Sequence, residues 1–419
     1  MEPAALDFAN ARSLWETDPN LTGKGIFIGA ICRSITYIND KPQNDFRFNM
    51  NHNSLYDADV SFADGTDGRF GISEHATSIA GIMLGLEDNA THPDGGTFNY
   101  RGTCPDASVN VYEFNSYLAQ LYARLPVKED IVVLSLGQMF EEWWTRALEQ
   151  AAAEKDFLVV ASVGNGASVY TPKPLYPGAG SNVLGVGVVN AVTDADGNIS
   201  LRDFSTPKAA NSSVGPTEDE RCKPDIVAPG TALIPTADTE NGYKLETNWS
   251  SLAGPIVAGT AALLEQKALS GDPLKNDFDQ PGKSLVLKAV LMNSARKLPF
   301  WHKGRTSGDD DQKTPLDHAQ GAGLLDGLAA QEQLTAGKGK PGPVKTIGWD
   351  NRVLQDDDPG YMYGFNVIEP NQIITATLCW NRVYRPAYPF DRLLEQDTDL
   401  RLELWGVDPD NPEKRVLLD

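Results

Sequence analysis

The chain has 419 residues, of which 57 are Asp or Glu and 36 are Lys or Arg, so its formal net charge is −21. This acidic balance, without a long basic run, argues against nucleic acid or an anionic membrane surface as a partner. The length allows one large domain and a smaller unit, and no apolar stretch approaches the ~20 residues of a membrane span.

The N-terminal end and the cysteines say little about the cellular compartment. Residues 1–7 lack the basic and apolar regions of a signal peptide. Either the protein is intracellular, or a signal and a pro-segment lie outside this sequence. The four cysteines are far apart and show no metal-type spacing, so we interpret them as isolated thiols. They are Cys32, Cys104, Cys222 and Cys379.

Short β-branched runs alternate with helical patterns over residues 25–190. Strands are predicted at 26–32, 109–112, 131–136, 157–161 and 183–189. Continuous apolar runs of this length suit a parallel sheet that is covered on both faces. Helices are predicted around 140–151, after residue 251 and at 285–295. The alternation predicts an α/β fold with a doubly wound, mostly parallel central sheet and helices on both faces.

A candidate general base lies in the segment 74–82. His75 precedes a helical pattern with Ile79 and Met83 on one face. A lone histidine is usually structural, so a catalytic role for His75 depends on whether other catalytic motifs follow it in the sequence.

A candidate oxyanion donor follows the strand predicted at 157–161. Ser162, Val163, Gly164, Asn165 and Gly166 come directly after it. A side-chain amide at this place could stabilise a developing oxyanion. The alternative is a plain turn, because Asn-Gly is a common turn dipeptide.

A candidate nucleophile lies in the segment 248–264. Ser251 stands at the start of a helix built mostly from small residues, with Pro255 four residues later. The unpaired N–H groups and partial positive charge of a helix N-terminus suit a serine that attacks carbonyl groups.

These segments resemble, in order, the histidine, asparagine and nucleophile blocks of the subtilisin-like serine proteases. The family blocks read His-Gly-Thr-His-Val-Ala-Gly, Ala-Ala-Gly-Asn-x-Gly and Gly-Thr-Ser-Met-Ala-x-Pro-x-Val-Ala-Gly. The resemblance implies that His75 is the catalytic histidine, Asn165 the oxyanion-hole asparagine and Ser251 the nucleophile. In the histidine block, Ala76 replaces the usual glycine and Ser78 replaces the second histidine.

Further segments extend the resemblance over residues 10–335. The segment 100–107 is similar to the family's turn Gly-Val-Ala-Pro-Asp-Ala, 223–230 matches a family signature without change, and 320–326 resembles the closing block. Ser135, Leu136 and Gly137 are similar to the strand end that binds extended substrate. With Ser162 and Gly164 they form the substrate-binding set that the resemblance implies.

The third catalytic position departs from the family pattern. The family has a strand that ends in Asp-Thr-Gly or Asp-Ser-Gly, whereas spacing from Gly25 places Cys32 on the aspartate. A neutral thiol accepts hydrogen bonds poorly, but a thiolate beside a protonated histidine could replace the charge. In the family the aspartate lies behind the histidine, on the side away from substrate, so the resemblance implies that Cys32 could not readily attack substrate.

A nearby carboxylate could also replace the missing acid. The loop before His75 contains Asp57, Asp59, Asp64 and Asp67. Glu74 adjoins His75, but neighbours on a helix point away from each other. The sequence leaves these alternatives open.

Two functions are therefore considered. The first is a subtilisin-like serine endopeptidase whose activity the cysteine at the third triad position could reduce. The second is a catalytically impaired pseudoprotease that acts as a peptide-binding or scaffold module, because a fold does not fix a function. The partner is a polypeptide substrate, and we expect a monomer. The resemblance implies secretion, with a signal and pro-segment absent from this sequence.

We expect no required cofactor and no catalytic metal. Members of the family often bind structural calcium, and 194–198 has alternating oxygen-bearing residues like a calcium loop. The segment lacks the distal glutamate of such a loop, so a solvated turn is the favoured interpretation.

The C-terminal part has a different pattern. We predict a domain over 1–336 and a Gly/Pro linker over 337–345. Residues 346–419 then form a β-sandwich-like antiparallel unit, expected to be incomplete. Apolar and polar residues alternate at 374–378 and at 400–404, which predicts strands there.

Overall fold

The computed structural model describes most of the chain. Not described are residues 1–2, 34–35, 39–40, 44–45, 64–71, 167–172, 304–313, 356–357, 359, 367–373, 397, 409–410 and 418–419.

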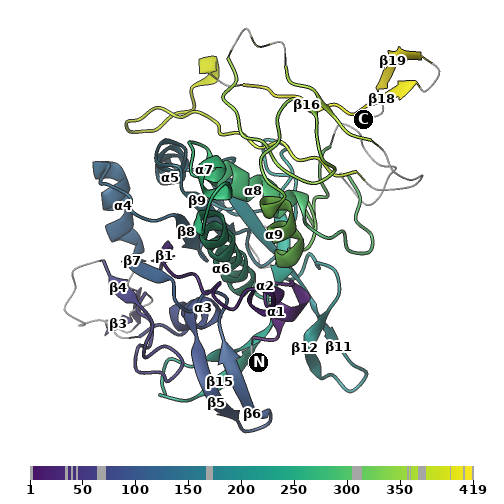
Figure 1. The fold of residues 1–419 in the computed structure, drawn as a ribbon. Coiled ribbons are helices and arrows are strands. Elements are labelled where there is room, and N and C mark those ends of the chain that lie inside the picture. Colours follow the sequence, from purple (N-terminus) through teal and green to yellow (C-terminus); the bar gives the residue numbers. More distant parts are fainter. Residues whose placement is uncertain are drawn as a thin grey trace.

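A seven-stranded sheet forms the centre of the molecule, and its neighbouring strands are all parallel (Figure 1). The strand order is β13-β10-β9-β8-β1-β7-β4. The strands are β1 (Phe27–Cys32), β4 (Val60–Phe62), β7 (Ser108–Glu113), β8 (Ile131–Leu134), β9 (Leu158–Ser162), β10 (Val183–Val189) and β13 (Ile226–Pro229). The predicted parallel sheet is confirmed, and the sequence analysis did not find β4 or β13.

Helices cover both faces of this sheet. One face packs on α3 (Glu74–Leu84), α6 (Ser250–Leu269), α8 (Lys283–Asn293) and α9 (Gly327–Thr335), and the other on α4 (Phe114–Ala123) and α5 (Trp143–Lys155). Side chains of β1 and β8 alternate between these two cores, as the pleat requires. The doubly wound α/β fold is therefore confirmed. Shorter helices are α1 (Ala5–Phe8), α2 (Ser13–Thr17) and α7 (Leu274–Phe278).

Antiparallel hairpins project from the sheet and its edges. They are β2 (Thr36–Ile38) with β3 (Lys41–Gln43), β5 (Leu86–His92) with β6 (Gly96–Arg101), β11 (Ala191–Thr193) with β12 (Ile199–Phe204), and β14 (Ala232–Pro235) with β15 (Tyr243–Glu246).

The small residues of α6 let this helix run through the middle of the core (Figure 1). A Cβ atom on Gly254 would lie 2.9 Å from Ser162 Oγ, and one on Gly259 would lie 2.5 Å from Thr103 Cβ. The helix therefore approaches β9 and the 102–104 loop more closely than larger residues would permit. Among the described residues, no helix is both long and apolar enough to cross a membrane.

The C-terminal part contains antiparallel pairing, but not where the alternation predicted it. The hairpin of β18 (Trp405–Asp408) and β19 (Asn411–Leu417) is antiparallel, while β16 (Gly342–Pro343) and β17 (Tyr363–Gly364) pair in parallel. The predicted strands at 374–378 and 400–404 are wrong. Among the described residues no second layer buries their apolar side chains, since Ile374 is 41% and Leu402 53% exposed. Alternation stabilises a strand only where one face is buried.

Residues 380–392 of this part pack on the large domain. Phe390 is 2% exposed and stacks on Trp143 of α5. Tyr384 donates a hydrogen bond to the buried carboxylate of Glu149 over 3.2 Å. The proposed division at 337–345 stays a prediction.

Candidate active site

Three of the predicted site residues lie at the carboxyl edge of the central sheet. Ile31 pairs with Leu134, and Leu134 pairs with Ala161. The next residue along each strand is Cys32, Ser135 or Ser162. These three residues therefore lie at the same level, at the carboxyl ends of β1, β8 and β9. This edge is where parallel α/β sheets place their functional groups.

Two strand-end serines hold the start of α6. Ser162 Oγ donates to the main-chain oxygen of Ser250 over 2.7 Å, and Ser135 Oγ donates to that of Ser251 over 2.9 Å. The second bond has a clear cause. Pro255 has no N–H to give to the carbonyl four residues earlier, so the hydroxyl of Ser135 supplies the missing donor.

The predicted nucleophile lies in the first turn of this helix. Ser251 is 9% exposed, and its hydroxyl donates to the main-chain oxygen of Ser135 over 3.5 Å. The described residues include no hydrogen bond between Ser251 and His75. The serine therefore lies at the helix N-terminus, but its hydroxyl forms no hydrogen bond to the predicted base His75.

The predicted oxyanion donor is oriented by Ser250. The Oδ1 atom of Asn165 accepts hydrogen bonds from the N–H and the hydroxyl of Ser250, each over 2.8 Å. With Oδ1 occupied, the amide Nδ2 turns away from Ser250, and no described residue accepts from it. The flanking Gly164 has a φ of +107°, which a residue with a Cβ rarely adopts. No motif in the sequence indicates that Ser250 orients Asn165.

His75 sits in the first turn of α3, whose N-cap is Ser73. The hydroxyl of Ser73 accepts from the N–H of Ala76 over 3.1 Å. Both ring nitrogens of His75 are buried and have no hydrogen-bond partner among the described residues. Burial lowers the pKa of His75 to about 4, and the positive charge of Arg33 lowers it as well. The imidazole is therefore neutral at pH 7, and no described residue orients it by a hydrogen bond.

Cys32 does not supply the missing charge. It is 2% exposed, and burial raises its pKa to about 12, although the nearby Arg33 opposes that shift. The thiol is therefore protonated at neutral pH, and the thiolate considered from the sequence is not supported. His75 and Cys32 form no hydrogen bond.

The described carboxylates among those considered, Glu74, Asp57 and Asp59, form no hydrogen bond to His75 either. Glu74 pairs with Lys244 over 2.7 Å. Asp59 accepts a hydrogen bond from the hydroxyl of Ser108 at the amino end of the sheet. Ser108 pairs five residues before the level of Cys32, which is about 16 Å along the strand. Asp57 precedes Asp59 in the same loop. Asp64 and Asp67 lie outside the described residues.

One carboxylate that the sequence analysis overlooked stands directly beside Cys32. Glu113 pairs with Cys32 across β1 and β7 and is 7% exposed. Its oxygens accept from the N–H of Ser116 over 2.9 Å and from Asn115 Nδ2 over 3.3 Å. Glu113 thus caps α4 and is engaged there rather than at His75.

Leu175 lies against two of the predicted substrate-binding residues. A Cβ atom on Gly137 would lie 2.9 Å from Leu175 Cβ, and one on Gly164 would lie 3.0 Å from its Cδ1. The N–H of Leu175 donates to Val163 over 2.8 Å. Leu136 is half-buried beside this point, and Leu175 fills the space between the two glycine-containing segments.

The segment 223–230, predicted from a family signature, serves the fold. Lys223 pairs with Asp225 in the interior and donates to the main-chain oxygen of Val183 over 2.8 Å. Asp225 accepts from the N–H of Gly185 over 2.6 Å. These bonds fasten β13 to β10.

The segment 194–198 forms a hydrogen-bonded turn. Asp194 accepts from the N–H groups of Asp196 and Asn198 over 2.9 and 2.8 Å. Within the described part of the chain, no group of three or more His, Cys, Asp or Glu residues could hold a metal ion. Structural calcium stays an expectation from the family resemblance.

Comparison with known proteins places this geometry in a family. A sequence model of the subtilase family matches residues 18–323. The serine protease AprX of Bacillus subtilis is 26% identical over 302 residues, which cover 63% of this chain and 62% of that protein. The PII-type proteinase of Lacticaseibacillus paracasei is 37% identical over 132 residues, 29% of this chain and 6% of that protein.

Two further similarities are weaker. The C5a peptidase of Streptococcus pyogenes is 32% identical over 120 residues, 28% of this chain and 9% of that protein. The solved structure of the prenylagaramide maturation protease PagA covers 77% of this chain and 98% of that chain, with 21% identity and a TM-score of 0.49. The chain spans 62% of AprX and 9% or less of the other two curated relatives. Because the family model matches most of its length, the chain belongs to the subtilase family.

Proposed function

We propose that this protein is a serine endopeptidase that cleaves peptide bonds slowly, because its base lacks the usual acid partner. The observation that carries the proposal is the pair of hydrogen bonds from Ser250 that holds the amide of Asn165 beside Ser251. A site with a positioned oxyanion donor can stabilise a tetrahedral intermediate before any base acts.

The proposed reaction uses three side chains. Ser251 attacks the carbonyl carbon while His75 takes its proton, and His75 gives that proton to the leaving amine as the C–N bond breaks. Water, deprotonated by His75, then hydrolyses the acyl-enzyme and restores Ser251, and Asn165 stabilises the oxyanion formed in each half of the reaction. The polypeptide lies extended along Ser135, Leu136 and Gly137 and adds a strand there. Before attack, the hydroxyl of Ser251 must turn from the Ser135 carbonyl toward His75.

The missing acid sets the speed. An orienting carboxylate fixes the histidine tautomer and stabilises the imidazolium, and its loss costs about ten-thousand-fold in kcat in chymotrypsin-like enzymes. Here the neutral thiol of Cys32 takes that position. The oxyanion donor and the binding of peptide would still leave a measurable rate.

A second candidate is a peptide-binding pseudoprotease. It is favoured by one observation: neither ring nitrogen of His75 has a hydrogen-bond partner among the described residues, and Ser251 donates elsewhere. In that case peptide would bind along 135–137 without being cut.

Labelling with a fluorophosphonate probe separates the two candidates. We expect covalent labelling of the 419-residue chain, lost in Ser251→Ala and slowed in Ser250→Ala, which leaves Asn165 unanchored. Intact-mass analysis should show one probe per chain. Absence of Ser251-dependent labelling between about pH 5 and 10 would exclude the peptidase. Binding of a fluorescent peptide by that unlabelled protein would then establish the second candidate.

A further inference from the structure

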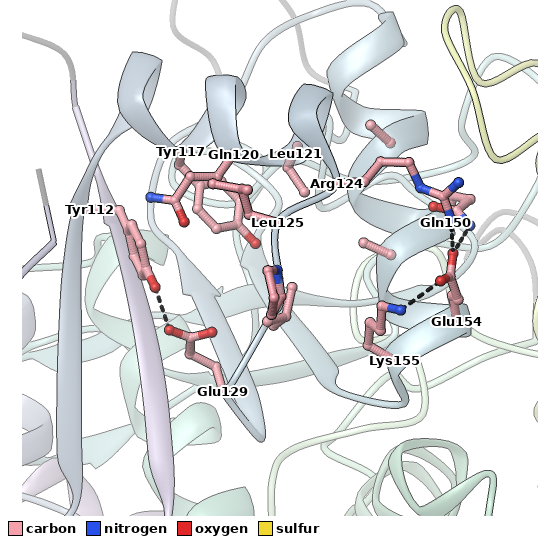
Figure 2. A pocket seen from close by; sticks show the side chains of 14 residues that line it. Tyr112, Tyr117, Gln120, Leu121, Arg124, Leu125, Glu129, Gln150, Glu154 and Lys155 are labelled. Carbon is pink, nitrogen blue, oxygen red and sulfur yellow. Dashed lines mark hydrogen bonds and ion pairs between the residues drawn. The ribbon is translucent and has the colours of Figure 1, made fainter.

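A separate cavity of about 190 Å³ lies between α4, α5 and β7, on the face of the sheet opposite α3 and α6 (Figure 2). Its walls come from the carboxyl half of β7, the loop 124–129 and the facing sides of both helices. No residue assigned to the proposed active site lines it. An engineered cavity of ~150 Å³ is large enough to bind benzene, so this one can hold a small organic molecule.

A buried carboxylate without a cation forms one end of the cavity. Glu129 is 7% exposed, and its Oε1 accepts from Tyr112 over 2.5 Å and from Asn110 Nδ2 over 2.8 Å. Its Oε2 accepts from the N–H of Lys128 over 3.0 Å. All three donors are neutral, and no described Lys, Arg or His forms an ion pair with Glu129. Buried charges in proteins are ordinarily paired.

A second buried polar group beside the cavity also has no partner. Tyr117 is 4% exposed, and its hydroxyl oxygen is buried without a hydrogen-bond partner among the described residues. Its ring packs against that of Tyr112 with 5.2 Å between centroids, and Figure 2 shows Tyr112 bonded to Glu129, with Tyr117 on α4 facing the same cavity. Burial raises the pKa of both phenols and the charge of Glu129 raises them further, so that charge lies close to both rings.

The charges at the other end of the cavity are already matched. Glu154 pairs with Arg124 over 2.7 Å and with Lys155 over 2.6 Å (Figure 2). These side chains are 34% to 46% exposed, so solvent screens them. Apolar side chains, among them Leu121 and Ala151, also line the cavity. Glu129 is therefore the charge in this cavity that still lacks a partner.

We propose that this cavity binds a small organic cation. The ammonium group would donate to Glu129 and to the hydroxyl of Tyr117, and an apolar body would fill the space beside Leu121 and Ala151. Charge-assisted hydrogen bonds to a carboxylate are stronger than neutral ones, and the two tyrosine rings favour a cation near their faces. The ligand would supply a cation for Glu129 and a hydrogen-bond donor for Tyr117, neither of which the described residues provide.

Calorimetric titration with three probes of one shape tests the proposal: benzylammonium, benzyl alcohol and benzoate. The Ser251→Ala protein is used, so the result does not depend on proteolysis. We expect benzylammonium to bind roughly tenfold more tightly than benzyl alcohol, and benzoate to bind least, because only the cation can pair with Glu129.

Variants assign the binding to named residues. Glu129→Gln should reduce benzylammonium affinity to that of the alcohol, and Tyr117→Phe should weaken it to a smaller extent. Glu154→Gln, a carboxylate of the same cavity that is already paired, should leave affinity within about threefold. Ala151→Leu should fill the cavity and abolish binding of every probe without touching a polar group.

The proposal is overturned by equal affinity for benzylammonium and benzyl alcohol, by an unchanged affinity in Glu129→Gln, or by no saturable benzylammonium binding at millimolar concentration. If Glu129→Gln fails to fold by circular dichroism, Ala151→Leu decides the matter. Benzylammonium binding that survives in Ala151→Leu then places the ligand elsewhere and refutes the site.

Discussion

Ser135 and Ser251 exchange hydrogen bonds across the boundary between sheet and helix. The hydroxyl of Ser135 donates to the carbonyl of Ser251 over 2.9 Å, and the hydroxyl of Ser251 donates back over 3.5 Å. The first bond replaces the donor that Pro255 lacks. The same contact therefore completes the helix and fixes the distance of the predicted nucleophile from the predicted substrate strand.

We expect Ser135→Ala to lower the free energy of unfolding by about 1–3 kcal/mol, because the buried carbonyl of Ser251 loses its donor. Urea denaturation measures this loss. Ser270→Ala in the same chain is the matched control: its exposed hydroxyl donates to Lys267 over 2.8 Å and should contribute below about 0.5 kcal/mol. Equal losses in the two variants would contradict the helix-completing role.

Cys32→Asp should accelerate labelling of Ser251 by at least about tenfold, because a carboxylate can orient His75 and stabilise its protonated form. Second-order labelling constants measure the gain. Cys32→Ser, which adds a polar group but no charge, should give no comparable gain. If the aspartate variant folds and labels no faster than the serine variant, the third position does not limit the rate.

The labelling rate should stay constant down to about pH 5, because His75 must be neutral to act as a base and its pKa is lowered to about 4. A pH–rate profile checks this. In Cys32→Asp the midpoint should move upward, since the new negative charge favours the imidazolium. A wild-type midpoint near the ordinary histidine value of 6.5 would disprove the buried, neutral state.

The same pKa shift links His75 to stability. In the unfolded chain the ring binds a proton below about pH 6.5, whereas the folded protein does not until about pH 4. The contribution of His75 is therefore present above pH 6.5 and is lost as the pH falls toward 4. The difference in unfolding free energy between the wild type and His75→Gln, measured by urea denaturation, should therefore change as the pH is lowered from 6.5 to 4 and stay constant above pH 6.5.

Leu175 should restrict the residue whose carbonyl is attacked to a small side chain, because it fills the space beside Gly137 and Gly164. A set of peptide esters should show faster acylation after Ala than after Phe, and Leu175→Ala should shift this ratio toward Phe by about tenfold. Leu86→Ala, at a residue 53% exposed, serves as control. An unchanged ratio in Leu175→Ala would remove Leu175 from the specificity site.

Phe390→Ala should lower the free energy of unfolding by about 3–5 kcal/mol, because this ring is buried against Trp143 of the large domain. Phe140→Ala, at a residue 58% exposed, should have a much smaller effect. A single cooperative transition is expected in both. If the Phe390→Ala loss appears only in a separate second transition, residues 380–392 do not support the large domain.

The sequence predicted the parts of the fold that follow from continuous apolar runs. Strands β1, β7, β8, β9 and β10 and helices α5, α6 and α8 lie where these patterns predicted them, within a few residues. Strand β4 has only three residues, too few to show a period. At 374–378 the period was present, but the sequence could not reveal that nothing covers its apolar side.

The site divides in the same manner. Motif spacing predicts Ser251, His75, Asn165 and Cys32 as site residues, because each follows a recognisable strand or precedes a helix. Ser250 and Leu175 carry no such signal. Their roles arise from contacts with residues 85 positions away or on a neighbouring segment, and only the tertiary structure brings these together.

Cys32 packs among apolar side chains in the main core, and no hydrogen bond within the described chain depends on its thiol. The residue therefore contributes volume to the folded state, and its thiol contributes no hydrogen bond among the described residues. A descendant of a fast protease could lose its acid here and keep its stability. Selection would act on such a change through turnover and leave the scaffold untouched.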